Sequence, residues 1–338
     1  EEFNRIVWCA QKAPLFASGM VNGYFDDNVP MEFWRLLALY ISSNTLSSVY
    51  WAIPFGQDEV NTMLNQAKEV LSWYDNMRNP VPTWYFKGYY LQYIDGIPFK
   101  LKSAFDFSFM KEYGTVFKVY DDQDSGNICF GTEKDGQRYF VKFAGAPTEQ
   151  FGGDPADAIS RLKATLPIYS DLKHKNLIEL IEAKEIGGGF AMVFKWADSD
   201  CMGRMYPAAH RRFMQLPVND RLAVFSDILS FLECVGSRNY VAIDFYDGSI
   251  MYDFVNGKTT ICDIDLFRKQ PCINDMERMW GSSRFQSPEE YLLGADIDEI
   301  TNVYTLGATA FALFGEYNRT REKWQLSDKL FEIATSCE

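Results

Sequence analysis

Two short runs decide the fold of this chain: NYVAIDFYDGSIMYDF at residues 239–254 and TTICDID at residues 259–265. The first run ends just before an NG dipeptide, which is a strong signal for a tight β-hairpin turn between two strands. This pattern puts one carboxylate, Asp244, in the loop before the hairpin and a second carboxylate, Asp263, directly after it. We therefore expect the hairpin to bring Asp244 and Asp263 close together.

The spacing of these residues resembles the catalytic loop of protein kinases, H-R-D-x-x-x-x-N, which is followed by D-F-G. In this comparison Asp244 matches the catalytic aspartate, Ser249 the asparagine and Asp263 the metal-binding aspartate. The resemblance implies that Asp244 aligns an acceptor hydroxyl and takes its proton. It also implies that Asp263 and Ser249 hold Mg²⁺ or Mn²⁺, and that the neighbouring Asp265 binds a second ion.

The same motifs depart from the kinase pattern in three places. Ala242-Ile243 stands in place of His-Arg, Ser249 in place of Asn, and Ile264-Asp265 in place of Phe-Gly. A serine hydroxyl is shorter than an asparagine amide, so Ser249 would reach an ion through a water molecule. We expect the second metal site to be weak for this reason.

Two runs further along the chain also resemble protein kinases. GSSRFQSPEE at 281–290 is similar to the segment G-T-x-x-Y-x-A-P-E, and VYTLG at 303–307 is similar to the D-V-Y-S-L-G helix after it. Ser282 matches the threonine that contacts the catalytic aspartate in Ser/Thr kinases. Asn302 replaces the aspartate that braces the catalytic loop, so we expect a looser brace. On these motifs residues 106–338 resemble a protein-kinase-like domain.

The resemblance implies an α+β, bilobal fold with an antiparallel, β-rich N-lobe at 106–196 and a helical C-lobe at 197–338. From residue 106 apolar residues alternate with polar ones, which independently predicts antiparallel strands. Lys142 follows YFV as the kinase lysine that contacts the nucleotide phosphates follows V-A-I. The other expected ATP-binding residues are Ser125 and Gly126 in a phosphate-facing turn, and Phe194, Lys195 and Ala197 near the hinge that would hold adenine.

A helix should start at Asp154-Pro155, because an N-cap acceptor followed by proline favours a helix start. In protein kinases a glutamate of this helix pairs with the strand lysine. Counting back from His174, whose HKNL run resembles H-P-N-I, that position is Thr165. We therefore expect the usual lysine–glutamate pair to be missing at Lys142.

Residues 1–86 show apolar residues at helical spacing and predict a helical segment. The runs EFNR (2–5), NGYF (22–25) and WYDN (73–76) are similar to the C-terminal helices of aminoglycoside-phosphotransferase-like proteins. That resemblance implies catalytic motifs upstream of residue 1, so we expect a fragment of a longer protein. The alternative, that residues 1–86 form an unrelated helical appendage, stays open. Residues 87–105 read as a connector that ends in a strand.

The composition excludes some classes of partner. A net charge of −13 argues against nucleic acid, since nucleic-acid binding depends on clustered lysine and arginine. No uncharged apolar run reaches the length of about 18 residues needed to cross a membrane. Seven scattered cysteines without a C-x-x-C pair predict reduced thiols and a cytoplasmic protein.

Three functions remain open from the sequence. The first is an ATP- and Mg²⁺-dependent phosphotransferase that acts on Ser or Thr hydroxyls of a protein, favoured by the joint presence of Lys142, Asp244 and Asp263. The second is a pseudokinase that binds nucleotide or a partner without turnover, favoured by the departures described above. The third is a small-molecule kinase of the aminoglycoside type, favoured by the DID run and the N-terminal segment.

Overall fold

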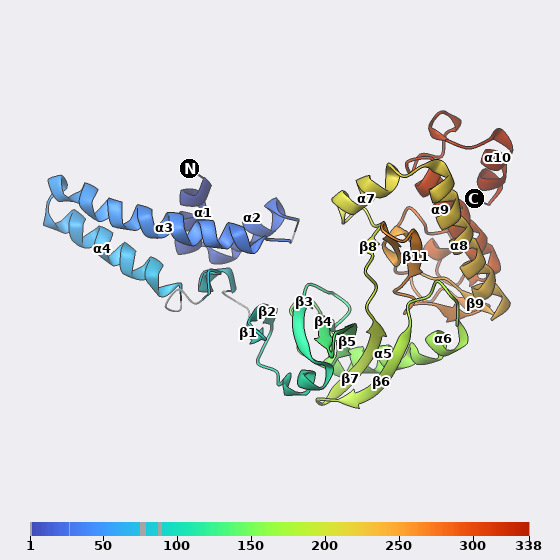
Figure 1. Cartoon of the computed structure of the whole chain (residues 1–338), viewed down its shortest axis with the longest axis horizontal. Coiled ribbons are helices and arrows are strands. Elements are labelled where there is room, and N and C mark those ends of the chain that lie inside the picture. Colours follow the sequence, from blue (N-terminus) through green and yellow to red (C-terminus); the bar gives the residue numbers. More distant parts are fainter. Residues whose placement is uncertain (1, 27, 75–78, 87–89, 338) are drawn as a thin grey trace. The chain divides into compact units, whose positions relative to one another are not determined.

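The computed structural model describes residues 2–26, 28–74, 79–86 and 90–337, which form an α+β structure (Figure 1). The described ranges hold ten α-helices and several antiparallel sheets, so the predicted α+β class is confirmed. None of these helices combines the length and the apolarity that crossing a bilayer requires. The chain divides into two compact units, described separately below. The first comprises Glu1–Phe105, Asp121–Asp124 and Pro147–Phe151, and the second comprises Asp106–Tyr120, Ser125–Ala146 and Gly152–Glu338.

The first unit consists of helices and, at its end, one β-hairpin. Its elements are α1 (Glu2–Lys12), α2 (Pro14–Tyr24), α3 (Met31–Ala52), α4 (Gln57–Ser72) and the antiparallel strands β1 (Tyr90–Ile94) and β2 (Ile97–Leu101). The interval 87–105, expected to be a connector that ends in a strand, therefore contains two paired strands. Residues 75–78 and 87–89 lie outside the described residues. The first of these ranges includes the last two positions of the WYDN run.

Aromatic side chains fill the core of this helical unit. The ring of Trp34 on α3 lies 4.5 Å from that of Tyr85 and 6.2 Å from that of Trp84. These residues are almost completely buried. Other apolar side chains of α3 face outward: Leu39, Leu46 and Tyr50 are 68%, 75% and 79% exposed. The helical spacing thus predicted α3 correctly, but only part of its apolar surface is buried within the unit.

Two later segments join the first unit by accepting hydrogen bonds from its backbone N–H groups. The Lys100 N–H donates to Asp121 Oδ2 at 2.7 Å, and the Lys102 N–H donates to the Pro147 carbonyl at 2.8 Å. Burial raises the pKa of Asp121. The Asp121 carboxylate is therefore bound to a backbone amide of β2 within the first unit.

The second unit begins with a five-stranded antiparallel sheet of order β3-β4-β5-β7-β6. The strands are β3 (Thr115–Tyr120), β4 (Asn127–Lys134), β5 (Gln137–Ala144), β6 (Leu180–Ile186) and β7 (Gly189–Lys195). Two helices follow β5 in sequence, α5 (Pro155–Ala164) and α6 (Leu166–Asp171), and α5 packs on β5 and β7. The predicted helix start is confirmed, because the Asp154 side chain caps α5 by accepting from the Ala156 N–H at 2.9 Å.

The rest of the second unit is mainly helical. Its helices are α7 (Pro207–Met214), α8 (Val218–Ser237), α9 (Glu299–Phe314) and α10 (Asp328–Ser336). Apolar residues between Arg221 and Val235 recur at helical spacing. Helix α8 buries Val224, Ile228 and Phe231 and packs along α9 (Figure 1). Short strands connect these helices: β8 (Asp200–Cys201), β9 (Tyr240–Val241), β10 (Ile250–Asp253), β11 (Lys258–Ile261), β12 (Arg268–Lys269), β13 (Cys272–Ile273) and β14 (Asp296–Ile297).

The predicted hairpin of the two deciding runs is confirmed. Strands β10 and β11 pair in antiparallel register with Ile250 opposite Ile261, and Gly257 in the turn has a φ of +65°. That left-handed conformation is one that glycine adopts without steric cost. The ladder continues one step further, where the Cys262 N–H donates to the Ser249 carbonyl at 2.9 Å. The loop that carries Asp244 therefore lies next to the end of β11.

Candidate functional site

Lys142 occupies a central position in the sheet. It lies in β5 between Cys129 of β4 and Met192 of β7. Its Nζ donates to Asp265 Oδ2 at 2.6 Å and to Asp263 Oδ1 at 3.2 Å. Burial alone would lower the pKa of Lys142, but the two carboxylates together hold it well above its ordinary value. The lysine is thus a fixed cation that joins the sheet to the segment after β11.

Asp265 is held from two sides. While Oδ2 accepts from Lys142, Oδ1 accepts from the hydroxyl of Tyr169 at 3.0 Å. Tyr169 lies on α6 and is only 6% exposed. Burial, and next to it the Asp265 carboxylate, raises the pKa of Tyr169 well above its ordinary value, so the hydroxyl keeps its proton and donates. Tyr169, Asp265 and Lys142 form a continuous hydrogen-bonded chain, called the lysine chain below.

The helix position expected to hold a glutamate takes no part in this chain. Thr165 is buried, and its hydroxyl donates to the Leu162 carbonyl at 2.8 Å and contacts Met192 Sδ at 3.3 Å. Among the ion pairs of the described residues, Lys142 has no carboxylate partner from α5 or α6. The nearest countercharge to Lys142 is therefore Asp265, which follows β11, and not a residue of α5 or α6.

Asp244 and Asp263 share an unusual backbone conformation. Their φ angles are +58° and +55°, in the left-handed region that costs free energy for residues other than glycine. Such conformations persist where the surrounding structure imposes them, often at functional sites. Burial, then Asp244 and Asp263 in turn, raises the pKa of Tyr246. Both carboxylates therefore lie near the same phenol.

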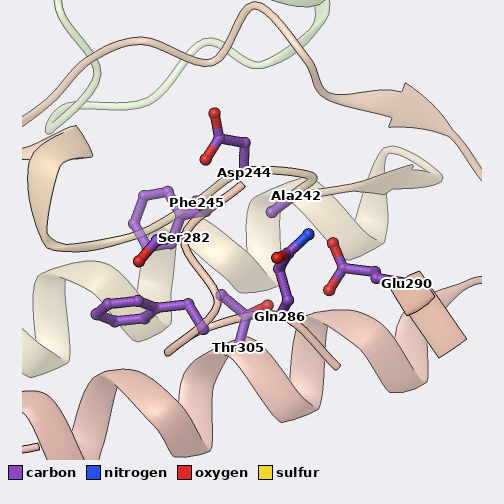
Figure 2. Close-up of a pocket in the computed structure, with 8 residues that line it drawn as sticks. Ala242, Asp244, Phe245, Ser282, Gln286, Glu290 and Thr305 are labelled. Atoms are coloured by element: carbon purple, nitrogen blue, oxygen red, sulfur yellow. The ribbon is translucent and has the colours of Figure 1, made fainter. Parts of the chain in front are cut away.

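Asp244 lines a small hollow between its loop and the segment of residues 281–290 (Figure 2). The hollow is too small to hold a water molecule. In Figure 2 the Asp244 carboxylate points away from the side chains of Gln286 and Glu290, and Ser282 lies on the same hollow. Ser282 was expected near the catalytic aspartate, and both residues contribute to this surface.

Asn302 braces the loop more firmly than expected. Its Oδ1 accepts from the Ala242 N–H at 2.8 Å, and its Nδ2 donates to the Tyr240 carbonyl at 3.0 Å. Asn302 is 3% exposed and lies on α9. The expectation of a loose brace is therefore wrong: an amide can accept from one backbone group and donate to another, which an aspartate cannot do.

The residues expected to bind metal differ in how well they suit that role. Asp263 has a side chain that is 56% exposed, so one carboxylate can bind an ion. Ser249 is completely buried, and its Oγ has no hydrogen-bond partner among the described residues. Both oxygens of Asp265 are already bonded. No group of three or more His, Cys, Asp or Glu side chains in the described ranges could hold a metal by itself. A Mg²⁺ ion here would thus depend on Asp263, on water and on oxygen ligands from outside the chain, a ligand set that suits it.

The expected phosphate-facing turn is only partly exposed, because Gly126 is buried. Ser125 is exposed, and the Gly126 φ of +82° is left-handed. Arg161 of α5 donates from Nη2 to the Ser125 carbonyl at 2.8 Å, which ties the turn to the helix. The turn of residues 121–126 contains a single glycine, Gly126. The backbone amides of this turn are the groups that could approach a phosphate.

The residues expected to bind adenine, at the end of β7, differ in their burial and in their backbone hydrogen bonds. Phe194 is 3% exposed, so its ring belongs to the core. The Lys195 N–H donates to the Glu179 carbonyl at 2.9 Å and the Trp196 N–H to the Arg138 carbonyl at 3.2 Å. Ala197 follows the strand and is half-buried. Backbone contact with a planar base would therefore centre on Ala197.

Sequence patterns did not mark two features of this region. Tyr169 lies one turn after Thr165 but belongs to no motif, so its contact with Asp265 could not be anticipated. Asp247 lies in the first of the two deciding runs but matches no motif residue. It accepts a hydrogen bond from the Tyr317 hydroxyl and lies 3.8 Å from Arg284 Nη2. A buried carboxylate three residues after the candidate base is the signal that could have pointed to a second polar cluster.

Comparison with known proteins assigns no family. No protein-family model matches the chain, and no curated protein matches its sequence significantly. The function is therefore argued from the geometry of the site.

Proposed function

We propose that residues 106–338 form a bilobal, protein-kinase-like domain that binds ATP with Mg²⁺ and transfers the γ-phosphate to a protein hydroxyl. The contact between Lys142 and Asp263 carries this proposal, because it joins residues 121 positions apart at 3.2 Å. A buried cation on a central strand and an exposed carboxylate at a hairpin end are the two groups that a metal–triphosphate complex needs. In this assignment the five-stranded sheet belongs to the N-lobe and helices α7 to α10 belong to the C-lobe.

Each residue of the site then has a defined role. Lys142 binds the phosphates, and Asp263 holds the Mg²⁺, which neutralises phosphate charge when bound. Asp244 aligns the acceptor hydroxyl: as the acceptor oxygen bonds to the γ-phosphorus and the bond to the ADP oxygen breaks, the hydroxyl proton passes to Asp244. The left-handed backbone at Asp244 and the Asn302 brace keep this carboxylate in a fixed position.

Asp265 has a different role in this proposal from the one expected from the sequence. Its two oxygens are bonded to Lys142 and Tyr169, so a second metal ion would compete with these two donors for the carboxylate. Asp265 instead keeps Lys142 charged and oriented. This role is the one that a helix glutamate fills in protein kinases, and Thr165 cannot fill it.

A second candidate is a pseudokinase that binds nucleotide without transferring phosphate. The buried position of Ser249 favours it, because only Asp263 then remains as an accessible metal ligand of the predicted set. Weak metal binding would leave nucleotide affinity but slow transfer. The two candidates differ in turnover and agree on where the nucleotide binds.

The test is transfer from γ-labelled ATP with Mg²⁺ or Mn²⁺, to the protein itself and to generic acidic and basic proteins. We expect Asp244→Asn and Asp263→Asn each to lower transfer by about 10²-fold or more, as loss of a general base or a charge-binding group does. Asp275→Asn is the matched control, since Asp275 is 64% exposed and pairs with Arg268. Transfer that is equal in all four proteins would refute the assignment. Absence of transfer together with an ATP-induced rise in Tm would favour the pseudokinase.

A further inference from the structure

A polar cluster lies beside the candidate base and is not used by the proposed transfer. The acceptor cluster consists of Arg204, Asp247, Arg284 and Tyr317. The guanidinium carbons of Arg204 and Arg284 lie 5.1 Å and 5.2 Å from the centre of the Tyr317 ring. The Tyr317 hydroxyl donates to Asp247 Oδ2. Two cations thus lie close to one aromatic ring whose hydroxyl donates to a buried carboxylate.

This cluster adjoins the surface on which an acceptor hydroxyl would lie. Asp247 follows Asp244 by three residues in the same loop. Phe285, the neighbour of Arg284, lines the hollow next to Asp244, and its ring lies 6.4 Å from that of Tyr317. If a protein segment binds with its acceptor hydroxyl at Asp244, the residues of that segment next to the hydroxyl would therefore lie at the acceptor cluster.

The outward charge of the acceptor cluster is positive. The Asp247 side chain is 4% exposed, whereas that of Arg284 is 37% exposed and Arg204 is exposed. Among the described residues, neither arginine is within hydrogen-bond distance of a carboxylate: Arg284 Nη2 lies 3.8 Å from Asp247, and no ion pair is formed by Arg204. One exposed guanidinium, that of Arg204, and one partly exposed guanidinium, that of Arg284, are thus presented by a protein whose net charge is −13.

Arg284 also has unused donor capacity. Its Nε–H is buried and has no hydrogen-bond partner among the described residues. A buried donor without a partner is costly, and such groups usually gain one from water or a ligand. The position of Tyr317 is imposed as well: its φ of +62° is left-handed, directly after Glu316 at +53°. The fold therefore fixes the ring against which both arginines are held.

We infer that the acceptor of the transferred phosphate is a protein segment with an anionic group close to its acceptor hydroxyl, bound by Arg204 and Arg284. Guanidinium groups bind carboxylates and phosphates through paired hydrogen bonds, so an acidic side chain and a phosphorylated side chain share the required chemistry. This inference rests on the proposed function, since it places the acceptor relative to Asp244.

The test uses the full chain and one serine peptide made in four forms: neutral, with flanking Asp residues, with a flanking phosphoserine, and with flanking Lys residues. The readouts are kcat/KM for transfer and, separately, Kd from fluorescence anisotropy. We expect the anionic forms to be preferred over the neutral form by about tenfold or more. Arg204→Gln and Arg284→Gln should each remove most of that ratio. The phosphoserine and Asp arms identify which anion is preferred.

Arg321→Gln is the matched control, because it removes the same charge from an exposed residue that pairs with Asp328. It should leave the ratio of anionic to neutral peptide unchanged. Equal use of all four peptides, preference for the Lys form, or an unchanged ratio in both cluster variants would overturn the inference. If no peptide is phosphorylated, the proposed function fails on its own assay, and the Kd values still decide whether the cluster selects anionic peptides.

Discussion

The two sides of the candidate site are built in opposite ways. On the lysine chain, Lys142 and Asp265 have side chains that are 12% and 18% exposed, and hydrogen bonds of 2.6 Å and 3.0 Å join them to each other and to Tyr169. In the acceptor cluster, Arg284 is more exposed and lies 3.8 Å from its carboxylate.

The difference follows from desolvation. A buried charge without a partner is strongly destabilising, so the lysine chain has to be complete before any ligand binds. Exposed guanidiniums remain solvated and can exchange water for a ligand. The lysine chain should therefore determine whether the site works, and the acceptor cluster should determine which acceptor it takes. The following changes test this contrast.

The largest effect should come from Asp265→Ala. It leaves Lys142 buried without its nearest countercharge and Tyr169 without an acceptor, so we expect a loss of about 3 kcal/mol in the free energy of unfolding. Nucleotide affinity should fall as well, because Lys142 loses its orientation. Chemical denaturation and ATP binding in EDTA and in Mg²⁺ measure these two effects. An affinity loss seen only with Mg²⁺ would show that Asp265 is a metal ligand and not a partner of Lys142.

A smaller effect is expected from Tyr169→Phe, which keeps the ring and removes the hydrogen bond to Asp265. Hydrogen bonds to charged groups contribute about 1.5–3 kcal/mol, so transfer should fall by about tenfold. Steady-state kinetics should show this mainly in KM for ATP. Tyr240→Phe removes a comparable bond, from the Tyr240 hydroxyl to Asp171 at 2.8 Å, and gives the stability cost of such a bond alone. An unchanged KM for ATP in Tyr169→Phe would show that Tyr169 does not help to orient Lys142.

The smallest effect should come from Glu290→Gln, in the segment of residues 281–290 that also contains Arg284. Glu290 is 2% exposed and accepts from the Ser287 N–H at 2.7 Å. Burial raises its pKa, although the Ser287 hydrogen bonds oppose this. A raised carboxyl pKa in the folded state means that the natural protein loses stability as pH rises from the unfolded value near 4.3 through the folded value.

Glutamine does not titrate and can still accept from Ser287. Glu290→Gln should therefore be more stable than the natural protein at pH 8, by less than about 1 kcal/mol, and this gain should vanish near pH 4. Thermal melts across this pH range measure it. A variant that is less stable at pH 8 would show that the Glu290 charge stabilises the segment of residues 281–290.

Much of the local structure could be predicted from sequence. The hairpin after Asp244, the capped start of α5 at Asp154-Pro155 and the amphipathic helix α8 all follow from signals that lie within a few residues. The paired strands between residues 87 and 105 were missed in part, since a proline at position 98 and a short apolar run resemble a connector.

The sequence by itself determined where strands, turns and helices form and which carboxylates end near the hairpin, because these depend on periodicity and on turn and cap residues. Only the tertiary structure decided that Lys142 pairs with Asp265, that Tyr169 completes the chain, and that Asn302 braces the loop. It also brought Arg204 and Arg284 close to one ring, that of Tyr317. These contacts join residues that are distant along the chain, and they depend on burial and side-chain direction, about which motif spacing carries no information.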